Sequence, residues 1–449
     1  MNDTKISLRE KAAYASLNIG NIPVMTLING YLLIFYTNIV GLDPRACATM
    51  FLIARILDGL TDPLVGFLID KLPSTRFGHF RPPLFVGTIL CTLNYLLLWF
   101  GPMMATSGKL VIAYISYILL GILFPIMDIS LNSLLPVMTS DMKERQTLSA
   151  IKGFVYAAGG VILGIAAPLI LGDASNRVGY ITLIVGSAVI IVAFSIFGTM
   201  GVKERVLKST GKDSSYTFKE LIIILTQKPV LVTFLAVLLF SIANNMQSTI
   251  TSYFFTYIIG DLKLSSVASF LMFLGLIIAT VFSGKVVEKK GKKPVFLFGF
   301  AVATFAFLIR LISPENIPLL MVSSAILGVG AGFISTLNYS IQADNTDFVE
   351  LKLGKRAEAG ISALSSFSSK FAAGVGGAVP GYLLGIAGFD GKVAVQPESV
   401  TTVILICQII LPAAIFFVGI LVFAKGYPIT RERLEEQNIL LAQKRNKIS

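Results

Sequence analysis

Apolar segments long enough to cross a lipid bilayer recur along almost the whole chain. A transmembrane helix requires about 20 mostly apolar residues. Runs of that size lie at 17–41, 46–70, 82–103, 110–138, 149–172, 178–201, 229–259, 264–287, 293–313, 316–342, 360–388 and 400–424. Hydrophobic residues make up 55% of the 449 residues and charged residues only 14%, which excludes a soluble surface. The sequence predicts an all-α integral membrane protein of about twelve transmembrane helices.

A polar stretch from Val202 to Lys228 divides these segments into two sets of six. We therefore expect a six-helix bundle at 1–201, a cytoplasmic linker at 202–228 and a second six-helix bundle at 229–424. The tail at 425–449 is expected to be cytoplasmic and could include a short helix.

The basic residues are distributed unevenly between the two sides of the predicted helices. Of the 37 Lys and Arg residues, only five lie in the loops of one side: Arg45, Lys109, Arg177, Lys263 and Lys392. This asymmetry follows the positive-inside rule and predicts a multi-pass protein of the cell membrane with both termini in the cytoplasm. Topology thus explains the net charge of +12, and we expect no nucleic-acid partner.

Residues that commonly support catalysis or bind metal are scarce. His79 is the single histidine, and the three cysteines have no paired spacing. The chain also lacks a nucleotide motif or a soluble catalytic domain. We therefore predict that it is not an enzyme and that it holds no cofactor.

Charged residues nevertheless occur inside the apolar runs, where each costs roughly 2.5–3.5 kcal/mol. Asp58 and Asp62 lie in the second run and Asp128 in the fourth. Arg55, Lys152 and Lys370 also lie in or beside such runs. The equal numbers of acids and bases suggest mutual pairing inside a polar cavity.

Asp58 and Asp62 are four residues apart, so both project from one helix face. Two buried carboxylates so placed repel each other, and the pair should hold a proton or bind a cation. The alternative is that they pair with Arg55 and only fix the helix. Against it, the corresponding positions of the second half are Leu276 and Thr280.

Several helices carry hydroxyl and amide side chains at helical spacing, as a sugar site requires. The first run has Asn18 with Asn21 and Thr26 with Asn29, and the eleventh has Ser362, Ser365, Ser366, Ser369 and Lys370. Such stripes also act as contacts between helices, worth about 0.6 kcal/mol each. We select Asn29, Ser365 and Ser366 as candidate substrate ligands.

A loop pattern recurs in the two halves. Gly66 is followed by Asp70 and then by Gly78 and Arg81, and Gly284 is followed by Glu288 and then by Gly291 with two lysines. This pattern resembles the signature loop of the major facilitator superfamily. The resemblance implies that superfamily's fold, with two six-helix halves around a central cavity.

More specific motifs are similar to those of the glycoside-pentoside-hexuronide:cation symporter family. They are the stretches 54–63 in the second run, 78–82 in the next loop, 127–136 in the fourth run, 343–358 after the tenth and 366–377 in the eleventh. The resemblance spans nearly the whole chain. It implies symport of a sugar with Na⁺, H⁺ or Li⁺ by alternating access.

The resemblance also assigns roles. It implies that Asp58, Asp62 and Thr61 bind the cation and that Asp128 binds sugar. Lys152 matches a basic substrate residue of the fifth helix. Lys370 matches a lysine of the eleventh helix that serves the substrate and coupling, and Arg55 is expected to act in coupling or gating.

Some positions depart from the family pattern. An acid of the first helix is replaced near Ile22, and an aromatic residue one turn after Asp128 is replaced by Asn132, which we retain as a substrate candidate. Thr61 occupies the position of a sodium-favouring asparagine, and Pro125 that of a threonine ligand. Fewer acids and two lysines leave room for an anionic sugar such as a hexuronide.

We therefore predict a functional monomer in the lipid bilayer that moves a glycoside or related sugar with Na⁺ or H⁺. One alternative is an uncoupled sugar facilitator, in which Asp58 and Asp62 are structural. Another is a related carrier for an amphiphilic solute that is not a sugar.

Overall fold

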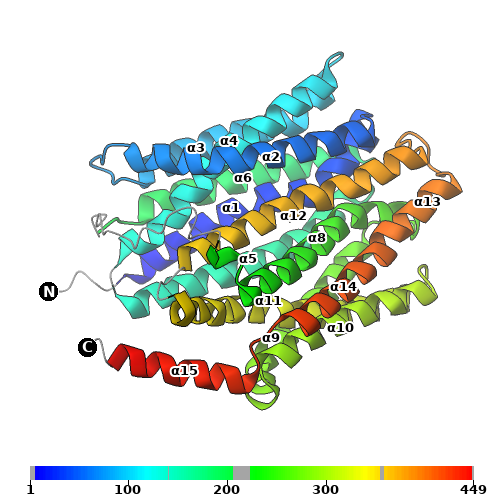
Figure 1. Ribbon diagram of the computed structural model, residues 1–449. Helices are drawn as coiled ribbons and strands as arrows, with labels where there is room; N and C mark the ends of the chain where they lie inside the picture. The colour runs from blue at the N-terminus through cyan, green and yellow to red at the C-terminus, as the bar shows by residue number, and fades with distance from the viewer. Residues whose placement is uncertain (1–5, 140, 206–222, 354–357, 447–449) are drawn as a thin grey trace. The chain divides into compact units, whose positions relative to one another are not determined.

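The computed structural model describes residues 6–139, 141–205, 223–353 and 358–446, and this part of the chain is almost entirely helical (Figure 1). The first half forms α1 (Leu8–Phe35), the π-helix η1 (Tyr36–Val40), α2 (Pro44–Lys71), α3 (Arg81–Met104), α4 (Lys109–Met138), α5 (Met142–Leu171) and α6 (Arg177–Gly201). The second half forms α8 (Lys228–Tyr257), α9 (Leu264–Lys290), α10 (Lys292–Ile312), α11 (Ile317–Leu353), α12 (Glu358–Ala387), α13 (Glu398–Leu405), the π-helix η2 (Ile406–Ile410), α14 (Leu411–Gly426) and α15 (Arg431–Asn446). The predicted all-helical fold class is confirmed.

Eleven helices among the described residues are long and apolar enough to cross a membrane. The segment expected at 46–70 forms α2, whose 28 residues extend about 42 Å. This helix is also long enough to span a bilayer. It carries Arg55, Asp58 and Asp62 within about two turns, so its composition alone does not mark it as a span.

The chain divides into two compact units. Unit 1 comprises Met1–Thr210, Thr251–Ser266 and Gly377–Thr401, and unit 2 comprises Gly211–Ile250, Val267–Gly376 and Thr402–Ser449. Unit 1 thus contains α1 to α6 together with the last part of α8, the start of α9, the last part of α12 and the start of α13. The domain boundaries expected at 201, 228 and 424 stay predictions.

Small residues and aromatic rings pack the helices of unit 1. A Cβ atom on Gly198 of α6 would lie 2.6 Å from the carbonyl oxygen of Ala13 on α1, so only glycine allows this approach. Phe35 packs edge-on against Trp99 and Tyr180, with ring centroids 5.0 Å apart in each pair. Because lipid removes most of the hydrophobic driving force between helices, close van der Waals packing of this kind stabilises the bundle.

Unit 2 uses the same principle around α11. A Cβ atom on Gly330 of α11 would lie 2.7 Å from the carbonyl oxygen of Gly299 on α10, which requires glycine at this crossing. Phe296, Phe300 and Phe416 are buried in the apolar core of this unit. The tail forms α15, which is fixed to α11 by a hydrogen bond of 2.8 Å from Gln437 to the backbone oxygen of Asp344. The short helix suggested for the tail is therefore present.

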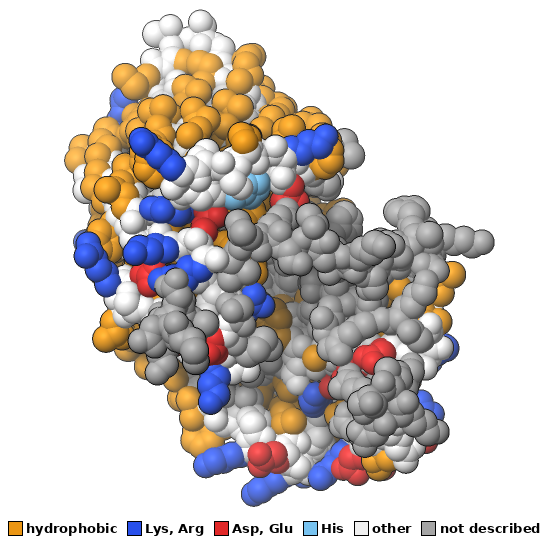
Figure 2. Space-filling view, turned by 90° about the vertical axis from the view of Figure 1, so that its left-hand side faces the viewer, with side chains coloured by type: hydrophobic (Ala, Val, Ile, Leu, Met, Phe, Trp, Pro, Cys, Tyr) orange, Lys and Arg blue, Asp and Glu red, His pale blue; other side chains and the backbone are white. Residues whose placement is uncertain are grey.

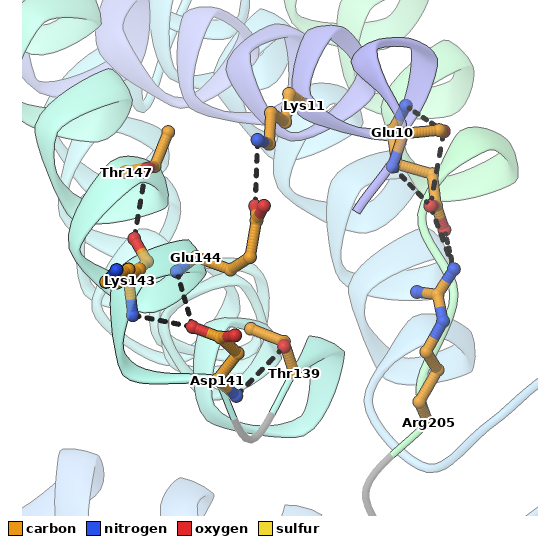
Figure 3. Close-up of polar contacts among 9 residues, drawn as sticks. Glu10, Lys11, Thr139, Asp141, Lys143, Glu144, Thr147 and Arg205 are labelled. Atoms are coloured by element: carbon orange, nitrogen blue, oxygen red, sulfur yellow. Dashed lines mark hydrogen bonds and ion pairs between the residues drawn. The ribbon is translucent and has the colours of Figure 1, made fainter. Parts of the chain in front are cut away.

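Polar contacts hold unit 1 together at the end where the amino terminus lies (Figure 3). Lys11 of α1 pairs with Glu144 of α5 at 2.8 Å, and Glu10 of α1 pairs with Arg205 at 2.9 Å. Asp141 accepts two backbone N–H groups at the start of α5. These contacts join the start of α1, the start of α5 and the segment after α6.

Glu204 caps the amino terminus of α3 at the same end of unit 1. Its carboxylate accepts hydrogen bonds from the backbone N–H groups of His79, Phe80 and Arg81 at 2.8, 2.9 and 2.9 Å. Gly78, with a φ of +113°, leaves space for this carboxylate, because a side chain there would collide with it. The arrangement is an anion site at a helix amino terminus.

Replacing Glu204 by alanine should destabilise unit 1, because three backbone donors lose a charged acceptor. We expect a loss of about 2–3 kcal/mol, since hydrogen bonds to charged groups each contribute about 1.5–3 kcal/mol and solvent replaces part of them. Thermal unfolding in detergent micelles measures this effect. Glu288→Ala is the matched control, because Glu288 is exposed and makes no hydrogen bond or ion pair within the described residues. Equal unfolding temperatures for the two variants would contradict the assignment.

Lys and Arg side chains gather on the face that Figure 2 shows, which looks at the molecule from the left-hand side of Figure 1. Hydrophobic side chains cover much of the neighbouring surface in the same view. A basic face beside an apolar surface agrees with the distribution of charge expected for a protein that spans a membrane.

Candidate functional site

The first group of candidate residues lies where α2 packs against α4 in unit 1. Asp58 is buried, and its Oδ2 atom pairs with Nη1 of Arg55 at 2.8 Å. Nη2 of Arg55 lies 3.3 Å from the hydroxyl oxygen of Tyr117 on α4, to which it donates. Arg55 and Asp58 are three residues apart and therefore lie on one helix face. The structure thus supplies the counter-ion that the sequence suggested for Asp58.

Thr61 and Gly121 complete this group. The hydroxyl group of Thr61 lies 3.3 Å from the backbone oxygen of Gly121 on α4 and 3.4 Å from the backbone oxygen of Asp58. Gly121 faces the carboxylate of Asp58 so closely that any Cβ atom would collide with it. Asp62 follows one turn later on α2 and is partly buried. The two carboxylates and the Thr61 hydroxyl therefore lie on neighbouring turns, with α4 packed against Asp58 and Thr61.

The second group surrounds Asp128, seven residues further along α4. Asn21 of α1 donates to Oδ1 of this carboxylate at 2.7 Å, and Asn132 of α4 donates to Oδ2 at 3.0 Å. Nζ of Lys152 on α5 donates to the side-chain oxygen of Asn132. Lys152 is thus joined to Asp128 through an amide rather than by a direct ion pair. Within the described residues, Lys152 forms no salt bridge.

Tyr156 of α5 contacts both ends of this group. Its hydroxyl oxygen accepts the second hydrogen of the Asn21 amide at 2.7 Å. Its ring lies near the ammonium group of Lys152, with Nζ 5.8 Å from the ring centroid. Lys152 and Tyr156 are one helical turn apart on α5, so both project toward α1 and α4. Three helices therefore contribute to one connected polar network.

A cavity of about 260 Å³ opens beside this network. Its walls are formed by residues of α1, α4 and α5: Asn21, Ile22, Met25, Thr26, Asn29, Phe124, Asp128, Tyr156 and Gly160. The predicted ligand Asn29 therefore lines the same cavity as Asp128. Ile22 gives this wall an apolar surface.

The remaining predicted residues belong to unit 2. Lys370 lies on α12 and is partly buried. Ser365 and Ser366 lie on the same helix, and their side chains fall outside the described residues. Their assignment to a substrate site stays a prediction.

Two residues of the network were absent from the sequence-based selection. Asn21 was visible as one of a pair with Asn18, but the spacing gave no reason to prefer either. The structure separates them, because Asn18 donates to the backbone oxygen of Tyr14 on its own helix. Tyr156 carried no signal, since an aromatic residue in an apolar run commonly faces lipid or core.

A larger cavity, of about 630 Å³, lies in unit 2 between the α9–α10 turn and α15. Several of its charged groups contact one another or the backbone. Nζ of Lys292 pairs with Asp344 at 2.7 Å, and Nζ of Lys293 donates to the backbone oxygen of Tyr427 at 2.7 Å. The cavity lies at the ends of helices, and none of Asp58, Asp62 and Asp128 lines it. We therefore place the candidate site at the smaller cavity beside Asp128.

These features define a multi-span membrane transporter, and comparison with known proteins identifies its family. A family model described as MFS/sugar transport protein matches residues 13–431. The chain therefore belongs to this family of sugar transporters within the major facilitator superfamily. Its relatives and structural neighbours are transporters, so the chain is a transporter rather than an enzyme.

Individual relatives agree with this assignment. The chain is 31% identical over 396 residues to the isoprimeverose transporter of Lactiplantibacillus pentosus, covering 84% of this chain and 80% of that protein. It is 26% identical to the glucuronide carrier protein homolog of Escherichia coli, covering 96% and 95% of the two chains. The crystal structure of a D-xylose-proton symporter superposes with a TM-score of 0.66 at 14% identity, covering 94% of this chain and 98% of that one. This likeness shows the fold alone.

Proposed function

We propose that the protein couples the movement of a glycoside to that of Na⁺ or H⁺ by alternating access. One observation carries this proposal: α4 contributes residues to both polar groups, the one at Asp58 and the one at Asp128. Gly121 contacts the Asp58 carboxylate, and Asp128, two helical turns later, lines the cavity. The two positions are about 10.5 Å apart along one helix. A shift of α4 on binding at one group therefore moves the other, which is the physical requirement for coupling.

The chemistry of α2 suits a monovalent cation. Asp58 and Asp62 are one turn apart, and their repulsion favours protonation or the binding of a cation at the pair. Thr61 adds a hydroxyl oxygen, and the backbone oxygen of Gly121 lies beside it. Oxygen ligands of this kind suit Na⁺, and a carboxyl group alone suffices for H⁺.

The chemistry beside Asp128 suits a sugar. The carboxylate accepts hydrogen bonds from hydroxyl groups, while Lys152 and Asn132 supply donors. Lys152 carries a positive charge with no ion-pair partner within the described residues, so an anionic sugar such as a hexuronide is included among the proposed substrates. The relative named as a glucuronide carrier homolog supports this extension.

We further propose a cell-membrane location, cytoplasmic termini and a functional monomer. The scarcity of Lys and Arg in the loops that carry Arg45, Lys109 and Lys263 supports the orientation. The proposal requires no cofactor besides the transported Na⁺ or H⁺.

Uptake into reconstituted vesicles tests the proposal. The panel consists of methyl glycosides of glucose, galactose, xylose and glucuronic acid, each with an imposed Na⁺ or pH gradient. An imposed driving force of 100 mV is worth about 2.3 kcal/mol per charge, so coupling to one ion should raise internal sugar roughly 50-fold above external sugar. Sugar that only equilibrates under every gradient would contradict coupling.

The uncoupled facilitator remains the competing function, and one observation favours it. The ion pair between Arg55 and Asp58 gives Asp58 a structural partner. In a facilitator, internal sugar would reach the external concentration and no more. If no sugar of the panel enters while an amphiphilic solute does, the protein is a carrier for amphiphilic solutes and not for sugars.

Gly121→Ala should weaken the cation site, because the added methyl group would displace the Asp58 carboxylate. We expect the ion concentration that gives half-maximal sugar uptake to rise at least about tenfold, equivalent to about 1.4 kcal/mol. Gly186→Ala on α6 is the matched control, since a Cβ there meets no atom within 4 Å. If sugar uptake by Gly121→Ala depends on the ion concentration as in the wild type, Asp58 does not belong to the cation site.

A further inference from the structure

The Asn21 amide has a defined orientation. Its Nδ2 atom lies 2.7 Å from Oδ1 of Asp128 and 2.7 Å from the hydroxyl oxygen of Tyr156. A carboxylate only accepts hydrogen bonds, so the amide must turn its NH₂ group toward Asp128. Both amide hydrogens are thereby used, one on each oxygen. Asn21 is 3% exposed, which holds this geometry in place.

This orientation leaves a hydrogen on Tyr156 for another partner. Because the tyrosine oxygen accepts from Asn21, its own hydrogen must point elsewhere. Among the described residues, no acceptor takes that hydrogen. Tyr156 lines the cavity together with Asp128, so the donor is available to a molecule bound there.

The spacing of the two oxygens matches a single hydroxyl group. The hydrogens of an amide nitrogen diverge by roughly 120°, so two bonds of 2.7 Å place the Asp128 and Tyr156 oxygens roughly 4.7 Å apart. One hydroxyl oxygen can lie within hydrogen-bond distance of both. It would donate to Asp128 and accept from Tyr156, which only a group that is both donor and acceptor can do.

We propose that Tyr156 is a substrate-binding residue that, together with Asp128, recognises one hydroxyl group of the transported sugar, and that Asn21 is the residue that positions the two. The proposal rests on the proposed function as a sugar transporter with its site at this cavity. It adds a specificity determinant on α5 that the sequence did not indicate. A site that hydrogen-bonds a substrate hydroxyl rejects the analogue that lacks it.

A purely structural contact between α1 and α5 is the competing explanation for the Asn21–Tyr156 bond. A single hydrogen bond between membrane helices contributes about 0.6 kcal/mol on average. Removing such a contact would alter all substrates alike. Removing a substrate contact alters only substrates that carry the recognised hydroxyl. The two explanations therefore differ in their dependence on the analogue.

Transport by Tyr156→Phe of mono-deoxy sugars provides the test. For the methyl glycoside that the wild type transports best, uptake is measured for the parent and for each mono-deoxy derivative. We expect Tyr156→Phe to raise KM about tenfold for the parent with little change in the maximal rate, as loss of one neutral hydrogen bond implies. The same change should occur for every derivative except one, for which wild type and variant have equal KM. Tyr95→Phe, which removes a buried hydroxyl bonded to Ser187 outside the cavity, should change none of them.

Asn21→Leu provides a second variant, because Tyr156 then loses the group that fixes its hydroxyl. This variant should raise KM for the parent and for every derivative except the same one that Tyr156→Phe leaves unchanged. Equal effects of Tyr156→Phe on every derivative, or no effect on any, would overturn the proposal. If the wild type transports none of the four glycosides and none raises its unfolding temperature, the proposed function fails, and this inference fails with it.

Discussion

Asp62→Asn should abolish uphill sugar accumulation while sugar still exchanges across the membrane. The substitution keeps the size of the side chain but removes the carboxyl group that we propose carries a proton or binds a cation. The accumulation ratio should therefore fall from roughly 50 at 100 mV to about 1, the value for uncoupled equilibration. Exchange of labelled sugar between equal internal and external concentrations should persist, because it needs no net ion movement.

Asp43→Asn is the matched control for this change. Asp43 precedes α2, is exposed and pairs with Arg45 at 3.0 Å, and asparagine can replace it as the helix cap. Accumulation should be unchanged in this variant. Full accumulation by Asp62→Asn would exclude Asp62 from coupling, and loss of exchange together with accumulation would indicate a misfolded or blocked carrier.

Asp128→Asn should produce the second large effect, a loss of sugar affinity of about 100-fold. The carboxylate accepts from Asn21 on one oxygen and from Asn132 on the other, and Asp128 lines the cavity. An amide at this position would direct its own NH₂ group at one of those donors. Hydrogen bonds to charged groups contribute about 1.5–3 kcal/mol each, and one or two of them account for the expected loss.

The measurement for Asp128→Asn is the concentration of sugar that half-saturates binding, determined by titrating the detergent-solubilised protein with sugar. Ser130→Ala on the same helix removes a buried hydroxyl and should leave this concentration unchanged. Wild-type affinity in Asp128→Asn would show that the cavity beside Asp128 is not where sugar binds.

The fold followed from physical rules that act locally. The backbone N–H and C=O groups of a membrane helix bond to one another within the helix, so the length of an apolar run is enough to locate the helix. Even α2, which three charges made less apolar, was located because its flanking residues are hydrophobic. The grouping of the last parts of α8 and α12 with the first half could not be predicted in this way, because it depends on contacts between residues more than 200 positions apart, such as Tyr253 with Thr37.

The site could be predicted in part. Charges inside apolar runs are costly, and this alone identified Asp58, Asp62 and Asp128. Their partners depend on how each helix is rotated about its axis, which sequence spacing does not determine. Asn132 was selected for its position, but its role as the link between Lys152 and Asp128 required the relative placement of α4 and α5. For the same reason Tyr156 could not be distinguished from an ordinary core aromatic residue.

Sugar-induced ion entry is the measurement that tests the central claim most directly. Sugar is added outside vesicles that have no ion gradient, and internal Na⁺ and pH are followed together. Coupled symport predicts that one of these ions enters in proportion to the sugar in the wild type and that Asp62→Asn abolishes this entry. Sugar entry without movement of either ion, at every pH and Na⁺ concentration tested, would contradict coupling and make the protein a facilitator.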